Sequence, residues 1–208
     1  MTVRLVASGD HGHRLQSGSR VIEAVWEEDR WLLAMGIGTS DPDASTVLDA
    51  GLVAEQGGSC ELGPLLNPVF QQAFSRVNGE GIGEILLVGQ HGLRHFSAVL
   101  RLSDREVCLE VADRWTAALP IGQFQLTWKT VGIVSIDASG AATIRGDDGN
   151  ISLVALATGG RLNLVDGRQL LHLPALTVGG GRLTVACQPG QVTVEPGTFQ
   201  YGVRALFA

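Results

Sequence analysis

The chain has 208 residues, of which 45% are hydrophobic and 17% are charged, and its formal net charge at pH 7 is −6. This composition is that of a folded globular protein with enough apolar side chains for one core, and it excludes intrinsic disorder. The acidic balance and the lack of any run rich in lysine or arginine argue against nucleic-acid binding, which needs clustered positive charge against the phosphates.

Glycine is abundant and aromatic side chains are scarce. The chain has 28 glycines, close to twice the usual ~7%, and only 5% of its residues are aromatic. It must therefore turn often and bury aliphatic side chains, which favours many short strands. We see no low-complexity linker and expect a single all-β domain over residues 1–208.

Neither export nor membrane insertion is indicated by the sequence. The start, MTVRLVASGDHGHR, lacks the charged and then apolar pattern of a signal peptide. No apolar stretch approaches the ~20 residues that span a bilayer as a helix. We therefore expect a cytoplasmic protein that does not bind membranes.

The first predicted elements form a hairpin. Two apolar runs flank the acidic triplet Glu27-Glu28-Asp29, which predicts strands at about 20–26 and 31–37. The next apolar segment, PLLNPVFQQAFSRV, is ambiguous. Its apolar residues Val69, Phe70, Ala73, Phe74 and Val77 fall on one face of a helix, although the run is also short enough for a strand. We expect one short helix near residues 68–77.

The period of two is clear in the middle of the chain. Strands are predicted in EILLVGQ, RHFSAVLRLSD and REVCLEVADRW, and in the last of these Glu106, Cys108 and Glu110 should share one face. From residue 124 onward, turn signals such as Ser139-Gly140 and Asp166-Gly167 recur about every 8–12 residues. The predicted fold is a large, supersandwich-like antiparallel β-sandwich.

Two histidine clusters are candidate sites. Asp10-His11-Gly12-His13-Arg14 brings together two imidazoles and a carboxylate, which suit zinc or a related divalent ion, although a polar turn explains the cluster without metal. In GQHGLRHFSAV, a turn at Gly92 would place His91 at its edge and His95 at the start of the next strand. Both could then face one cavity and transfer protons.

A third candidate lies in Asp113-Arg114-Trp115, where an Asp–Arg pair beside an indole could bracket a polar ring with an apolar face. An ion pair at a strand end with Trp115 in the core is the alternative interpretation. Trp26, Trp31 and Trp128 are interpreted as packing residues. The chain has no GxSxG, Walker A, HExxH or dinucleotide fingerprint.

One family resemblance is present. The block HFSAVLRLSDREVCLEVADRW, residues 95–115, resembles the strand–turn–strand passages of galactose-mutarotase-like β-supersandwiches, and the ending PGTFQYGVRALF is similar to their terminal strands. The resemblance implies a polar ladder that faces a carbohydrate site. In the mutarotases a histidine is the general acid and a glutamate the general base, and the resemblance assigns neither role to a numbered residue here.

The leading functional prediction is recognition of a carbohydrate or polar small molecule on a concave sheet face, with acid/base chemistry on a sugar if the protein is an enzyme. His91 and His95 would be the acid and base, while Arg94, Asp113, Arg114 and Trp115 would position the substrate. No cofactor is expected, and a homo-oligomer is left open. The alternatives are a non-catalytic assembly subunit and a metal-dependent cupin-like barrel that uses His11 and His13.

Overall fold

A computed structural model describes most of the chain. The described residues are 2–37, 61–120, 125–131, 133–146, 149–157, 161–167, 169–171, 175–179, 182–186 and 193–207. This part of the chain is built from strands and contains no helix, and so none that is long and apolar enough to cross a membrane. The predicted all-β class is confirmed.

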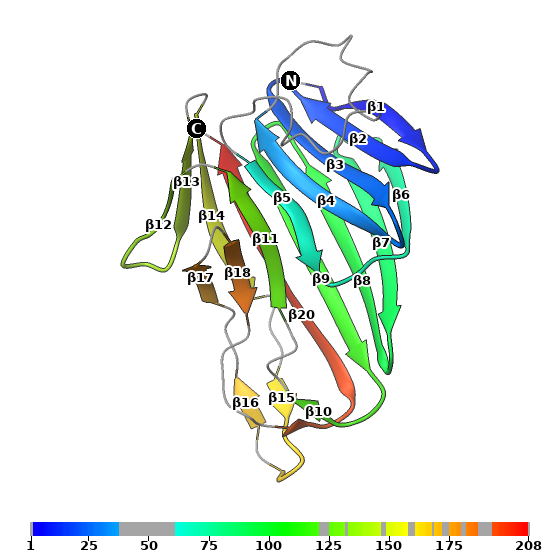
Figure 1. The fold of residues 1–208 in the computed structure, drawn as a ribbon, viewed down its shortest axis with the longest axis vertical. Coiled ribbons are helices and arrows are strands. Elements are labelled where there is room, and N and C mark those ends of the chain that lie inside the picture. The colour runs from blue at the N-terminus through cyan, green and yellow to red at the C-terminus, as the bar shows by residue number, and fades with distance from the viewer. Residues whose placement is uncertain are drawn as a thin grey trace.

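Two eight-stranded antiparallel sheets make up most of the fold (Figure 1). Sheet A has, from edge to edge, β1 (Arg4–Gly9), β2 (Gly12–Ser17), β3 (Arg20–Glu27), β4 (Arg30–Ile37), β5 (Glu61–Asn67), β11 (Gln125–Val131), β18 (Arg182–Ala186) and β17 (Ala175–Gly179). Sheet B has β12 (Ile133–Ile136), β13 (Ala142–Gly146), β14 (Gly149–Ala157), β20 (Gly197–Phe207), β9 (Glu106–Trp115), β8 (Arg94–Leu102), β7 (Gly83–His91) and β6 (Gln72–Val77).

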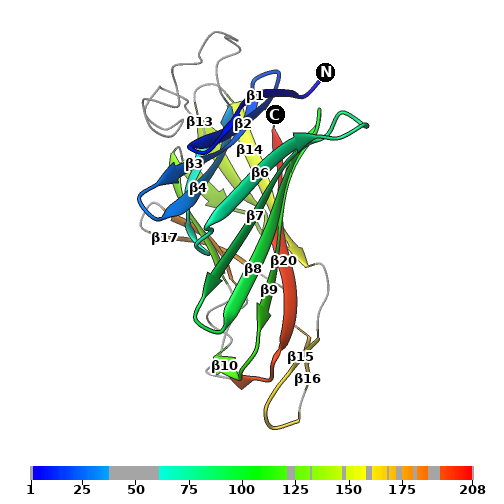
Figure 2. The same cartoon turned by 90° about the vertical axis from the view of Figure 1, so that its right-hand side faces the viewer.

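The sheets pack face to face, and Figure 2 shows β6 to β9 and β20 of sheet B turned toward the viewer. Two short ribbons lie at the lower end in Figure 1: β10 (Leu119–Pro120) paired with β19 (Thr193–Val194), and β15 (Arg161–Asn163) paired with β16 (Gln169–Leu171). The predicted hairpin at 20–26 and 31–37 is confirmed as β3 and β4. Strands β1, β2 and β5 were not predicted as strands.

Alternation along each strand creates the core. In β9, Val107, Leu109 and Val111 are buried, whereas Glu106, Cys108 and Glu110 face the other way, as predicted. The inward residues of both sheets join one apolar cluster, whose largest fully buried members are Trp128, Tyr201, Phe70 and Phe199. At about 25 cal/mol per Å² of apolar surface, this burial is the main source of stability.

Residues 68–77 do not form the expected helix. The peptide N–H of Trp31 in sheet A donates to the Phe70 carbonyl at 2.8 Å, and the chain then enters sheet B as β6, paired with β7. Phe70 and Ala73 are buried, but Phe74 is 59% exposed and Val77 38%. A helix would have put all four on one face. The spacing of these apolar residues fits both a helix and a strand, and pairing with β7 makes the segment a strand.

An ion-pair ladder crosses the outer face of sheet B. Glu84 accepts hydrogen bonds from Arg76 at 2.7 Å and Arg101 at 3.2 Å, and Arg101 also pairs with Glu110. Burial alone would raise the pKa of Glu84, but the two guanidinium groups outweigh this effect and lower it. The outward carboxylates therefore have structural partners.

Gly202 gives a direct test of the packing in sheet B, because it pairs with Glu110 and Leu156 in the middle of the sheet. A Cβ at this position would collide with the Leu109 carbonyl oxygen. We expect Gly202→Ala to lower the free energy of unfolding by about 3 kcal/mol. A Cβ at Gly179 meets nothing within 4 Å, so Gly179→Ala is the control. Equal urea midpoints for the two variants would contradict the register.

Candidate functional site

A pocket of about 500 Å³ opens where sheets A and B meet. It is lined by residues from β1 and the β1–β2 turn, from β2, β3 and β4, and from the start of β6 and the residue before it: Ser8, Gly9, Asp10, His13, Trp26, Trp31, Gln71, Gln72, Ala73 and Phe74. Its size and its mixture of indole, carboxylate, hydroxyl and amide groups are typical of small-molecule sites.

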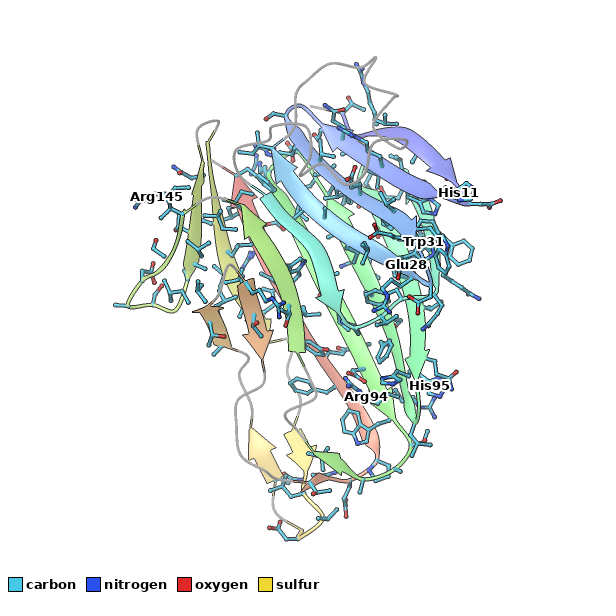
Figure 3. The ribbon with its side chains drawn as sticks, in the orientation of Figure 1. His11, Glu28, Trp31, Arg94, His95 and Arg145 are labelled. Atoms are coloured by element: carbon cyan, nitrogen blue, oxygen red, sulfur yellow. The ribbon has the colours of Figure 1, made fainter. Side chains whose placement is uncertain are left out.

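The β1–β2 turn lines the mouth of this pocket, and the β3–β4 turn connects the two tryptophans of its lining. The N–H of Trp26 donates to the His11 carbonyl at 3.0 Å, which holds the β1–β2 turn beside the end of β3. Trp26 and Trp31 are cross-strand partners that flank the β3–β4 turn, where Glu28 has a positive φ of 55°. Their rings meet edge to face with centroids 5.7 Å apart. Figure 3 shows His11, Glu28 and Trp31 on this side of the molecule.

His13 forms part of the inner wall of the pocket. Its Nδ1 lies 2.9 Å from the Ser75 Oγ and 3.4 Å from the Ser8 Oγ, and its ring centroid is 5.1 Å from that of Trp31. Only 5% of the residue is exposed. Burial lowers the pKa of His13, and the Ala73 carbonyl acts in the opposite direction without reversing the shift. The imidazole is therefore neutral at neutral pH.

Gln71 is fixed on the side of the pocket that belongs to sheet B. Its Nε2 donates to the Gln90 carbonyl at 3.1 Å, and its Oε1 accepts from the Gln90 N–H at 2.7 Å. The segment can approach β7 this closely because residue 89 is a glycine. A Cβ at Gly89 would collide with the Val69 carbonyl oxygen. Gln72 and Phe74 are exposed beside it. The Gln71 side chain is thus held in place by main-chain contacts.

His91 and His95 lie on opposite faces of sheet B. Gly92, with φ 59°, makes the predicted turn between β7 and β8. His91 pairs with Arg94 and Gln90 pairs with His95, so the two histidines point to different sides of the sheet. Both are exposed. The geometry does not bring them into one cavity.

His95 is a neighbour of Arg114 on the outer face of sheet B. A smaller hollow of about 170 Å³ lies next to this pair and is lined by Ser97, Val99, Glu110, Val111, Ala112 and Gln200. This surface is the one that most resembles the polar ladder expected from the sequence. It has no aromatic side chain among its lining residues.

Arg94, Asp113 and Trp115 face the interior. Arg94 forms an ion pair with Asp113, which is fully buried, and its guanidinium carbon lies 5.5 Å from the Phe96 ring centroid. Trp115 is 3% exposed and donates from Nε1 to the Glu195 carbonyl at 2.6 Å. Burial raises the pKa of Asp113, and Arg94 opposes this rise. Trp115 lies in the core, as the alternative interpretation expects, but the ion pair differs from the expected one. Asp113 pairs with Arg94 of β8 and not with its neighbour Arg114, which lies on the opposite face of β9.

The two histidines predicted as metal ligands, His11 and His13, differ in burial. His11 is exposed in the β1–β2 turn, while His13 is buried against Trp31 and Ser75. Within the described ranges, no three His, Cys, Asp or Glu side chains gather in a way that could hold a metal ion. The structure therefore adds no observation in favour of the cupin-like alternative.

Sequence reasoning missed much of the pocket. Trp26 and Trp31 were assigned to packing, and Ser8, Gln71 and Gln72 were not considered at all. One signal was available, because the predicted hairpin already makes Trp26 and Trp31 cross-strand neighbours at its turn. No known protein-family model matches this chain, and a search of curated proteins finds no match either.

The buried Arg94–Asp113 pair leads to a prediction for stability. We expect Arg94→Met to cost about 3 kcal/mol at pH 7, because it leaves the Asp113 carboxylate buried without its cation. The folded-state pKa of Asp113 would then rise further above its unfolded value of ~3.9, so the loss should shrink as the pH falls through the raised pKa.

The control is Arg114→Met, on the exposed outer face, which should change stability by less than about 0.5 kcal/mol. Urea unfolding of both variants at several pH values gives the comparison. A similar cost for both, with no pH dependence for Arg94→Met, would show that the ion pair has no structural role.

Proposed function

We propose that this protein binds a carbohydrate or a related polar small molecule in the pocket between the β1–β4 end of sheet A and the start of β6. The observation that carries the proposal is the half-buried indole of Trp26, held edge to face against the buried Trp31, in a pocket that polar side chains also line. A sugar has apolar C–H faces and a rim of hydroxyls. The indole of Trp26 matches a face, and carboxylate, hydroxyl and amide groups match the rim.

The polar groups have distinct roles in this proposal. Asp10 accepts hydrogen bonds from ligand hydroxyls, while Ser8 and Gln72 supply both donors and acceptors. Gln71 is already bonded to the main chain of β7, so its role is to fix the wall rather than to contact the ligand. Preorganised walls reduce the entropy lost on binding.

Binding is better supported than catalysis. The Nδ1 of His13 is bonded to Ser75, and its Nε2 is buried without a hydrogen bond of good geometry. His91 and His95, the residues predicted to act as acid and base, are not among the residues that line this pocket. We therefore propose recognition of the ligand without a chemical step.

The test is a thermal-shift and calorimetric screen against neutral monosaccharides and oligosaccharides. A ligand that binds only the folded protein raises its melting temperature by mass action. We expect Trp26→Ala to weaken binding about tenfold or more through the loss of stacking, a difference of about 1.4 kcal/mol. The double variant His91→Ala/His95→Ala should bind as the unmodified protein does.

Two results would contradict this assignment. If no sugar shifts the melting temperature at millimolar concentration, the proposed function is wrong. If the double histidine variant loses binding while Trp26→Ala keeps it, the ligand binds at the β7–β8 end of sheet B instead.

One observation favours the second candidate, an assembly subunit. Strand β12 is at an edge of sheet B, with β13 on one side and no described strand on the other, and its Ile133 is 75% exposed. An open edge with an apolar side chain can pair with another chain. This proposal commits to a second copy of the same protein.

Light scattering after gel filtration tests the edge-pairing proposal. We expect the mass to rise toward that of a dimer with concentration, and Ile133→Asp to keep the protein monomeric. Val165→Asp, at an exposed valine outside β12, is the control and should dimerise as the unmodified protein does. A monomer at every concentration would eliminate this candidate.

A further inference from the structure

The mouth of the pocket is acidic. Asp10, from the β1–β2 turn, lines the pocket, and Glu27 at the end of β3 and Glu28 and Asp29 in the β3–β4 turn follow the lining residue Trp26 in the chain. The hydrogen bond from Trp26 to the His11 carbonyl joins the ends of these hairpins. Arg30 pairs with Asp29 at 2.7 Å, so the other three carboxylates leave a net negative charge, one of them in the lining of the pocket and two beside Trp26.

Positive charge is scarce inside the pocket. Among the described lining residues, Asp10 is the one charged side chain, and no lysine or arginine is present. His13 does not compensate, since burial lowers its pKa and keeps the ring neutral. A pocket with such walls attracts cations and repels anions, and the effect is strongest at low ionic strength.

The aromatic side chains of the pocket also favour a positively charged ligand. The negative face of an indole attracts an ammonium group placed above it, and the attraction grows when the cation is partly desolvated. Trp26 is half-buried and meets Trp31 at 67°, Trp31 itself is only 6% exposed, and the exposed ring of Phe74 lies at the rim, so Trp26 and Phe74 supply the accessible aromatic surfaces. An accessible indole face beside a carboxylate is suited to an organic cation.

We propose that the pocket selects an amino sugar, whose ammonium group is held by the Asp10 carboxylate and an indole face, over neutral and anionic sugars. This inference rests on the proposed function, because it takes carbohydrate binding in this pocket as its starting point. It adds that the ligand carries a positive charge and that Asp10 recognises this charge.

Calorimetric titration of the full chain with matched probes tests the inference. The probes are glucosamine, glucose, N-acetylglucosamine, glucuronate and choline. We expect glucosamine to bind about tenfold more tightly than glucose or N-acetylglucosamine, glucuronate to bind least, and the preference for glucosamine to weaken as salt is added. Asp10→Asn should remove the preference while binding of glucose persists.

Asp104→Asn is the matched control, since Asp104 is an exposed carboxylate in the β8–β9 turn, outside the lining of the pocket. It should leave the preference unchanged. If glucose and glucosamine bind equally, the charge selectivity is wrong and carbohydrate binding stands. If choline binds as tightly as glucosamine and no neutral sugar binds, the site reads an ammonium group alone, and the amino-sugar assignment is overturned. If no probe binds, both proposals fall.

Discussion

Two apolar sheet faces have to be buried against each other, and this constraint places every other feature of the molecule. The inward side chains of sheets A and B form one cluster. Between β5 and β6 the chain leaves sheet A and enters sheet B, and Trp31 binds the Phe70 carbonyl at that crossing. The pocket opens at the same place, because the ends of the β1–β4 hairpins there meet the first residues of sheet B.

The same constraint explains His13. In β2, Leu15 is fully buried, and His13 lies two residues earlier on the same face of the sheet. An imidazole in this position has to be neutral, and its Nδ1 is bonded to Ser75 of sheet B. A polar side chain of sheet A therefore reaches the opposite sheet at the point where the apolar core gives way to the pocket.

The sequence predicts strands well where alternation is strong, as in β7, β8 and β9. It fails where the apolar spacing fits two periods, as in residues 68–77, and where a strand carries little apolar signal, as in β1 and β2. The residues of β2 read GHRLQS, and their burial depends on neighbouring strands that local sequence does not reveal.

Prediction of the site is limited by distance along the chain. His91 and His95 are close in sequence, yet the register of β7 and β8 separates them onto two faces. Gln71 and Gln72 reach the pocket only because the chain crosses between the sheets just before β6. Asp113 and Arg94 could be paired only once the register of β8 and β9 was known.

The pocket draws its floor and its mouth from different parts of the fold. Its deep wall includes His13 and Trp31, which pack into the sandwich, whereas Asp10 and Glu28 belong to hairpin turns at the surface. Turn residues are exchanged at small cost to stability when the flanking strands are held by a core. The chemistry of the pocket's mouth can therefore diverge between descendants of this protein by changes at two turns, while the scaffold that supports the pocket is inherited intact.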